Sequence, residues 1–240
     1  MKEGYRTYCF PDRYEGLPNQ LFHNNGDGTF TVLMNHELTA ASGSTRAHGL
    51  KGAFVSKWTI DKETLTVLHG EDLMKQAFVW NTVSNAYVPA TVPFSRFCSA
   101  DLPALSAFYD RASGAGYRGL IYMNGEENGT EGRAFAHLMD GTSYELPALG
   151  KLAWETSVAN PKTGRKTVVV GTDDGTGGQV YVYVGTKLRT SNPIAAAGLN
   201  NGVLYGIKVN GFTAEDPTNG IPSGTSFTGV WLGNVAGKTG

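Results

Sequence analysis

Short hydrophobic segments, rich in β-branched residues, alternate with turn residues along most of the chain. Residues 24–28, Asn-Asn-Gly-Asp-Gly, form a hairpin signal because Asn and Gly tolerate positive φ, and the alternating segment 29–33 follows directly. Residues 54–60 and 65–68 flank a polar turn in the same way. Further strands are predicted over residues 134–138, 144–146, 179–184, 204–209 and 227–232.

Helix signals are few, and we predict only two short helices, over residues 102–111 and 192–197. Many short strands at regular spacing favour a sandwich, a barrel or a propeller. A recurrence of strand ends at about 45 residues favours an all-β fold, a β-propeller of four-stranded antiparallel blades in a single domain over residues 1–240. We expect the propeller to be incomplete, with open blade edges that favour self-association, because segment 227–232 has no strand after it.

Three predicted strands end directly in paired acidic or amide groups. A buried strand that presents oxygen ligands at its end can build a site for a hard cation, and Ca²⁺ needs several such oxygens from separate parts of a fold. Three ends of the same form therefore predict a site for several metal ions. The three ends are Asn35-His36-Glu37, Asn124-Gly125-Glu126-Glu127 and Gly171-Thr172-Asp173-Asp174.

Composition narrows the function classes. Hydrophobic residues make up 40% of the chain and charged residues 17%, which fits a buried core. The net charge of −1 and the lack of a basic stretch argue against nucleic-acid binding, and no apolar run is long enough to span a membrane. Residues 1–12 lack the apolar segment of a signal peptide. Cys9 and Cys98 permit one disulfide or two buried thiols, and they form no zinc pattern by themselves.

Several short motifs, in the same order, resemble the PhoX-type alkaline phosphatases, a family of secreted bacterial β-propellers. The resemblance runs from about Leu33 to about Lys208. Two positions depart from the family pattern, since Trp154 stands where the family has His and Gly125 where it often has a second Cys. The resemblance also implies a further C-terminal half with more of the ligands. The motifs are residues 33–37 with 46–49, 97–100, 126–128, 150–155 and 170–174.

The resemblance implies hydrolysis of phosphate monoesters at a cluster of iron and calcium ions, in a periplasmic or secreted protein. Metal ions would supply the positive charge that a phosphate substrate and a poor leaving group need. The resemblance implies Cys98 as an iron ligand, with its thiolate form stabilised by the metal. The metal carboxylates of first choice are Glu37, Glu126, Glu155 and Asp173, and those of second choice are Glu127 and Asp174.

Each of these assignments has an ordinary structural alternative. A pair of acidic residues at a strand end is commonly a solvated turn, His36 is more often a core histidine than a ligand, and Cys98 can be an inert buried thiol. Arg46 and His48 can bind phosphate or belong to surface ion pairs, and for Arg133 we favour an ion pair. The alternative function is a calcium-stabilised propeller without catalysis, which serves as a structural or binding module.

Overall fold

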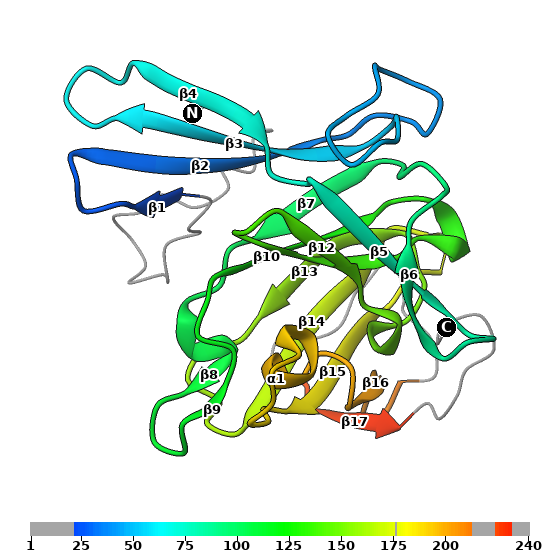
Figure 1. Cartoon of the computed structure of the whole chain (residues 1–240). Helices are drawn as coiled ribbons and strands as arrows, with labels where there is room; N and C mark the ends of the chain where they lie inside the picture. Colours follow the sequence, from blue (N-terminus) through cyan, green and yellow to red (C-terminus); the bar gives the residue numbers. More distant parts are fainter. Residues whose placement is uncertain (1–21, 176, 213–223, 232–240) are drawn as a thin grey trace, which may run out of the picture.

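The computed structural model describes residues 22–175, 177–212 and 224–231, which form three large β-sheets and a two-stranded ribbon (Figure 1). The first sheet has the order β1-β2-β3-β4, the central sheet β6-β5-β12-β11-β10-β7, and the third sheet β13-β14-β15-β16-β17. In the first sheet the strands are β1 (Phe22–Asn24), β2 (Thr29–His36), β3 (Phe54–Asp61) and β4 (Val67–Asp72). In the central sheet they are β5 (Gln76–Asn81), β6 (Ala86–Pro89), β7 (Phe97–Asp101), β10 (Ile121–Glu126), β11 (Ala134–Leu138) and β12 (Thr142–Glu145). In the third sheet they are β13 (Trp154–Ala159), β14 (Lys166–Asp173), β15 (Val180–Thr186), β16 (Val203–Val209) and β17 (Phe227–Trp231).

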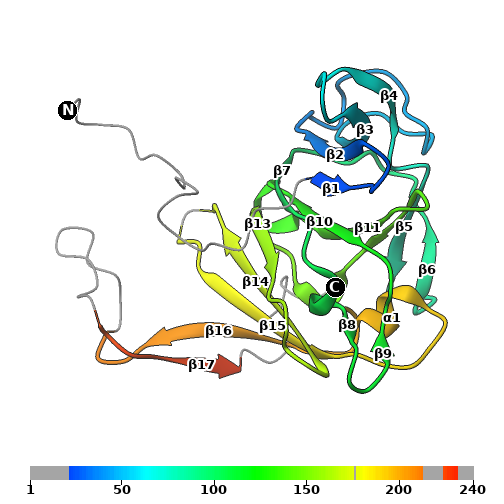
Figure 2. The same ribbon diagram turned by 90° about the vertical axis from the view of Figure 1, so that its left-hand side faces the viewer.

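The expected all-β fold with four-stranded antiparallel blades is confirmed. Each large sheet contains four strands that pair antiparallel in sequence order: β1 to β4, then β7 with β10 to β12, then β13 to β16. Figure 2 shows the strands of the third sheet fanning outward from β13 to β17. Strand β5 adds to the central sheet parallel to β12, which the sequence patterns did not predict. Within the described residues none of the three sheets closes on itself, and self-association through their edges stays a prediction.

The predicted hairpins are confirmed, whereas one of the two predicted helices is wrong. Residues 192–197 do form a helix, α1 (Pro193–Ala197), because the Asn192 side chain accepts a hydrogen bond from the Ala195 amide at 2.9 Å. Residues 102–111 instead contain a 3₁₀ turn (Leu105–Ala107) followed by strand β8 (Tyr109–Asp110). Strand β8 pairs with β9 (Ala115–Gly116), so its backbone groups are used in a ribbon rather than in a helix.

Two hydrophobic cores lie on the two faces of the central sheet. Ile121 and Met123 of β10 belong to the core shared with the third sheet, and Tyr122 belongs to the core shared with the first sheet. Successive side chains of a strand point to opposite faces, so a strand covered on both sides is buried along its whole length. Every residue of β10 is buried, which explains why its sequence is not an alternating pattern. In the described part of the chain no helix is long and apolar enough to cross a membrane.

A polar group is buried in this central sheet. His137 of β11 is fully buried, and its ring nitrogens lie 2.8 Å from Asn124 Oδ1 and 2.8 Å from Ser143 Oγ. Burial, with a smaller contribution from the charge of His48, lowers the pKa of His137 from 6.5 to about 3. The native protein therefore holds His137 neutral at pH values where the unfolded chain would protonate it.

This burial predicts an acid dependence of stability. Between pH 6.5 and 3 the unfolded chain binds a proton at His137 and the native chain does not. As the pH is lowered through this range, His137 should therefore reduce the free energy of unfolding by up to about 1.4 kcal/mol per pH unit. Urea unfolding of the parent and of His137→Gln, measured from pH 7 to pH 4, should show the shallower decline in the variant. Equal slopes in the two proteins would contradict the prediction.

Candidate metal centre and adjoining pocket

Strand β7 lies where the three sheets meet. It forms the edge of the central sheet, and it also contacts β2 of the first sheet and β13 of the third. Neither of these contacts is a backbone ladder, so side chains must determine how the three strands fit together. Candidate ligands on different sheets can therefore converge at this junction.

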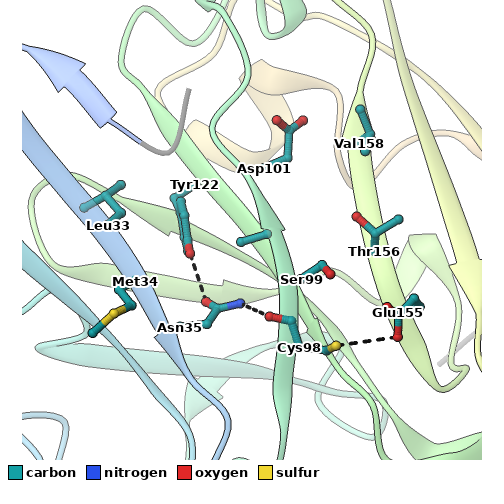
Figure 3. A pocket seen from close by; sticks show the side chains of 11 residues that line it. Leu33, Met34, Asn35, Cys98, Ser99, Asp101, Tyr122, Glu155, Thr156 and Val158 are labelled. Atoms are coloured by element: carbon teal, nitrogen blue, oxygen red, sulfur yellow. Dashed lines mark hydrogen bonds between the residues drawn. The ribbon is translucent and has the colours of Figure 1, made fainter. Parts of the chain in front are cut away.

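Asn35, at the end of β2, joins three strands with one side chain. Its Nδ2 donates a hydrogen bond to the Cys98 carbonyl oxygen at 2.6 Å, and its Oδ1 accepts from Tyr122 Oη at 3.1 Å (Figure 3). The same Oδ1 accepts from Asn124 Nδ2 at 2.9 Å. The amide is suited to this because it offers both donors and acceptors. Asn35 therefore positions the backbone of β7 at Cys98.

Cys98 and Glu155 both lie at irregularities of their ladders. The pairing of β7 with β10 shifts between the partners of Asn124 and Glu126, which places an extra residue in the Cys98 stretch of β7. The pairing of β13 with β14 shifts between Trp154 and Thr156, which leaves Glu155 as the extra residue. Such bulges redirect side chains and are common beside active sites.

The two redirected side chains meet a third acidic group from the end of β10. Cys98 Sγ lies 3.5 Å from Glu155 Oε2, and one ligand atom from each of Cys98, Glu127 and Glu155 lies within 4.8 Å of the others. In the residues that the structure describes, this is the one group of three such ligand atoms. Burial, a hydrogen bond with Glu127 and the charge of Glu155 raise the pKa of Cys98 to about 12. A cation bound between these groups would offset the repulsion between their negative forms.

Arg96 supplies positive charge at the edge of this cluster. Its Nη2 lies 2.7 Å from Glu127 Oε1 and 3.1 Å from Glu37 Oε1. The sequence motifs did not single out Arg96, because it lies between two phenylalanines of the core rather than at a strand end. Glu37 is thus brought to the cluster through a shared arginine.

Glu126 and Glu127 point in opposite directions, as expected for neighbours in a strand. The side chain of Glu126 is only 3% exposed and forms a two-pronged ion pair with Arg133, at 2.7 and 2.9 Å. It also accepts a hydrogen bond from the Ser95 amide at 2.9 Å. Glu126 therefore lies against Arg133 in the core, and Glu127 lies beside Cys98; the choice between them as metal ligands stays a prediction. The ion pair favoured for Arg133 is present.

Asp173 and Asp174, from the end of β14, are not part of the cluster. Asp173 accepts hydrogen bonds from the amides of Ala153 at 3.1 Å and Gly175 at 3.0 Å, so its carboxylate organises the local backbone. Asp174 is exposed. Both placements fit the alternative of a turn at a strand end.

Arg46, His48 and His36 also take structural positions. Arg46 forms an ion pair with Asp72 and lies over the Phe54 ring at 3.8 Å, while the ring of His36 stacks on the same phenylalanine at 3.9 Å. His48 packs against a core phenylalanine ring. Among the described residues, neither Arg46 nor His48 lines the pocket beside the cluster.

That pocket has a volume of about 520 Å³ and opens between β2, β7 and β13 (Figure 3). Cys98 and Glu155 belong both to its wall and to the cluster. At the other end lies Asp101, whose pKa is raised by burial although it accepts a hydrogen bond from the Ala159 amide. Among the described residues that line the pocket there is no Lys, Arg or His, so its charged groups are the carboxylates of Glu155 and Asp101. The remaining lining residues are Leu33, Met34, Asn35, Ser99, Ala100, Tyr122, Thr156 and Val158.

Trp154, next to Glu155, is packed against two glycines. It is 2% exposed, and a Cβ atom added to Gly125 or to Gly171 would lie 2.4 Å from it. Gly125 and Trp154 are the two positions that depart from the family pattern, and the structure shows that they touch. The Cβ added at Gly125 would meet Cβ and Cγ of Trp154, whereas the one added at Gly171 would meet the indole ring, so the large indole requires glycine at 171.

The sequence matches no known family model and no curated protein. Among solved structures, the fold is similar to that of Pseudomonas fluorescens PhoX in complex with vanadate, described as a transition-state analogue, with a TM-score of 0.54 and 13% identity. The similarity covers 79% of this chain and 44% of the PhoX chain, so this chain spans less than half the length of PhoX. The similarity to PhoX is one of fold.

The contact between Trp154 and Gly171 predicts a strong coupling of free energies. A Cβ added at Gly171 would lie 2.4 Å from Trp154 Cζ3, so Gly171→Ala should destabilise the parent by about 1–3 kcal/mol. In a Trp154→Ala background, which removes the indole ring, the same change should cost much less, with a coupling of about 0.5–3 kcal/mol in a double-mutant cycle. Chemical unfolding of the four proteins measures it. Costs that simply add would show that the two positions are independent.

Proposed function

We propose that this protein is a metal-dependent phosphomonoesterase of the PhoX type. The observation that supports the proposal best is the convergence of Cys98, Glu127 and Glu155 at the edge of a pocket, in a chain with the fold of PhoX. Family membership itself is part of this proposal, and so is a periplasmic or secreted location, which rests on the resemblance alone.

The donor set fits a metal ion with borderline character better than a hard one. A thiolate together with carboxylates suits iron, whereas Ca²⁺ takes oxygen ligands only. Cys98, Glu127 and Glu155 would hold iron, and Glu37, which shares Arg96 with Glu127, is the further carboxylate that could serve a calcium ion. When bound, such ions polarise the phosphoryl oxygens and activate an oxygen nucleophile.

The side chains that line the pocket suit the alcohol part of the ester. Its wall combines apolar side chains such as Leu33 and Val158 with the hydroxyl groups of Ser99 and Thr156. Its two carboxylates would repel a second phosphate group. A small neutral alcohol therefore fits this pocket, with the phosphate held at the cluster.

The alternative function, a calcium-stabilised propeller without catalysis, has one observation in its favour. Several carboxylates at the strand ends have structural partners: Glu126 pairs with Arg133, and Asp173 accepts hydrogen bonds from backbone amides. A thiol inside the remaining cluster favours the enzyme, because a calcium-only site has no use for a thiolate.

Glu127 and Glu126 offer a matched test of the metal site. Glu127→Gln should lower iron affinity on the order of tenfold or more while the fold stays intact, because the amide loses the anionic charge that holds the cation. Glu126→Gln should instead destabilise the protein by about 3–5 kcal/mol, since it leaves the buried Arg133 without a partner charge. Metal content by mass spectrometry, hydrolysis of an aryl phosphate and thermal unfolding separate the two effects.

Glu131→Gln is the control, because Glu131 is an exposed carboxylate that pairs with Lys151 outside the cluster. It should change neither metal content nor stability beyond the range of a surface substitution.

Cys98→Ser should lose iron and its thiolate absorption band while it keeps part of any bound calcium. Unchanged iron in both Glu127→Gln and Cys98→Ser would refute the metal site, and a colourless calcium-bound parent without activity would support the structural module.

The charge of the pocket predicts the substrate preference. The metal-loaded protein should hydrolyse a phosphate monoester of a small neutral alcohol at least about tenfold better, in kcat/KM, than a bisphosphate of similar size, because each buried charge repulsion costs more than 1.4 kcal/mol. Asp101→Asn should reduce this preference, since Asp101 lines the pocket away from the cluster. Equal preference in parent and variant would show that Asp101 does not select the substrate.

A further inference from the structure

Arg96 occupies the position of a cation between two acidic side chains. Its guanidinium group binds Glu37 through Nε and Nη2, at 3.2 and 3.1 Å, and Glu127 through Nη2 at 2.7 Å. The Arg96 side chain is 43% exposed, whereas that of Glu127 is only 15% exposed. Ion pairs at this degree of exposure are weak, so the guanidinium can leave its partners at small cost.

The backbone of Arg96 is held independently of these ion pairs. Its amide donates to the Leu38 carbonyl oxygen at 2.8 Å, and its carbonyl oxygen accepts from the Glu127 amide at 2.9 Å. Its φ of +51° lies in the left-handed region, which a residue other than glycine rarely adopts. Such a conformation persists only where the surroundings fix it, as these two hydrogen bonds do. The side chain can therefore change partners while the backbone stays in place.

Glu127 is the residue for which two cations would compete. Its carboxylate binds Arg96, and it also provides one of the ligand atoms within 4.8 Å of Cys98 and Glu155. A carboxylate bound to a guanidinium has less negative charge to offer to a metal ion. A metal ion at the cluster would in turn weaken the hold of Glu127 on Arg96.

We propose that Arg96 is an internal competitor for the metal site, which bound metal displaces from Glu127, and that the released guanidinium then binds the phosphate group at the metal. The inference rests on the proposed metal site. It explains why Arg96 binds the carboxylates beside the cluster and lies two residues from Cys98. A planar guanidinium is suited to both partners, because it binds carboxylates and phosphates through paired N–H groups.

The test compares Arg96→Gln with Lys151→Gln, which removes an equal charge from a pair with Glu131 outside the cluster. Binding of Fe²⁺, measured by anaerobic calorimetry, should be roughly 5- to 20-fold tighter in Arg96→Gln than in Lys151→Gln, within the usual range of coupling between two sites. Inorganic phosphate should bind to the metal-loaded Arg96→Gln protein about tenfold more weakly than to the parent, because a charge-assisted hydrogen bond is lost.

Arg96→Lys serves as a second variant that keeps the charge, and it should bind the metal as the parent does but bind phosphate less tightly, since it lacks the planar fork. Equal metal affinity in Arg96→Gln and Lys151→Gln would overturn the competition, as would a metal-loaded crystal structure in which Arg96 still binds Glu127. A parent protein that binds no Fe²⁺ would refute the proposed metal site itself. Circular dichroism of each variant shows whether the fold is retained.

Discussion

The candidate site depends on how one edge strand, β7, is joined to two neighbouring sheets without a backbone ladder. On one side, Asn35 of β2 donates a hydrogen bond to the Cys98 carbonyl of β7 and accepts hydrogen bonds from two side chains of β10. On the other side the contact between Cys98 and Glu155 bridges to β13. Since hydrogen bonds from side chains are directional, these contacts determine which ligand atoms can meet. The packing of the sheets and the geometry of the site are therefore set by the same few residues.

The charges of the site follow from this arrangement. Three sheets bring acidic groups to one place, and among the described residues Arg96 is the cation that pairs with the ones at the cluster. Burial and the neighbouring acidic groups disfavour a further negative charge here, which is why the pKa of the Cys98 thiol is raised. By contrast, Glu126 has a full partner charge in Arg133. A pair of adjacent glutamates thus divides into one structural residue and one candidate ligand.

The sequence allowed the fold class to be predicted because hairpins and turns are local. Residues 24–28 and 61–64 form the expected turns, and β11 has the predicted bounds. The choice between Glu126 and Glu127 could not be predicted, since it depends on which face of β10 meets Arg133 and which meets Cys98. Arg96 was missed for the same reason: its partners come from β10 and from the end of β2, far away in the sequence. The helix predicted over residues 102–111 does not form, because the pairing of β8 with β9 outweighs the local helix preference of the sequence.

The two positions that depart from the PhoX pattern touch each other, through Gly125 and the Cβ and Cγ atoms of Trp154. The indole ring of Trp154 fills the space beside Gly171, and its Nε1 has no hydrogen-bond partner within the described part of the chain. A buried indole donor without a partner is a cost that the surrounding apolar contacts must offset. Such a residue contributes packing and no ligand. The metal chemistry proposed for this chain therefore rests on Cys98, Glu127 and Glu155, which lie together where the sheets meet.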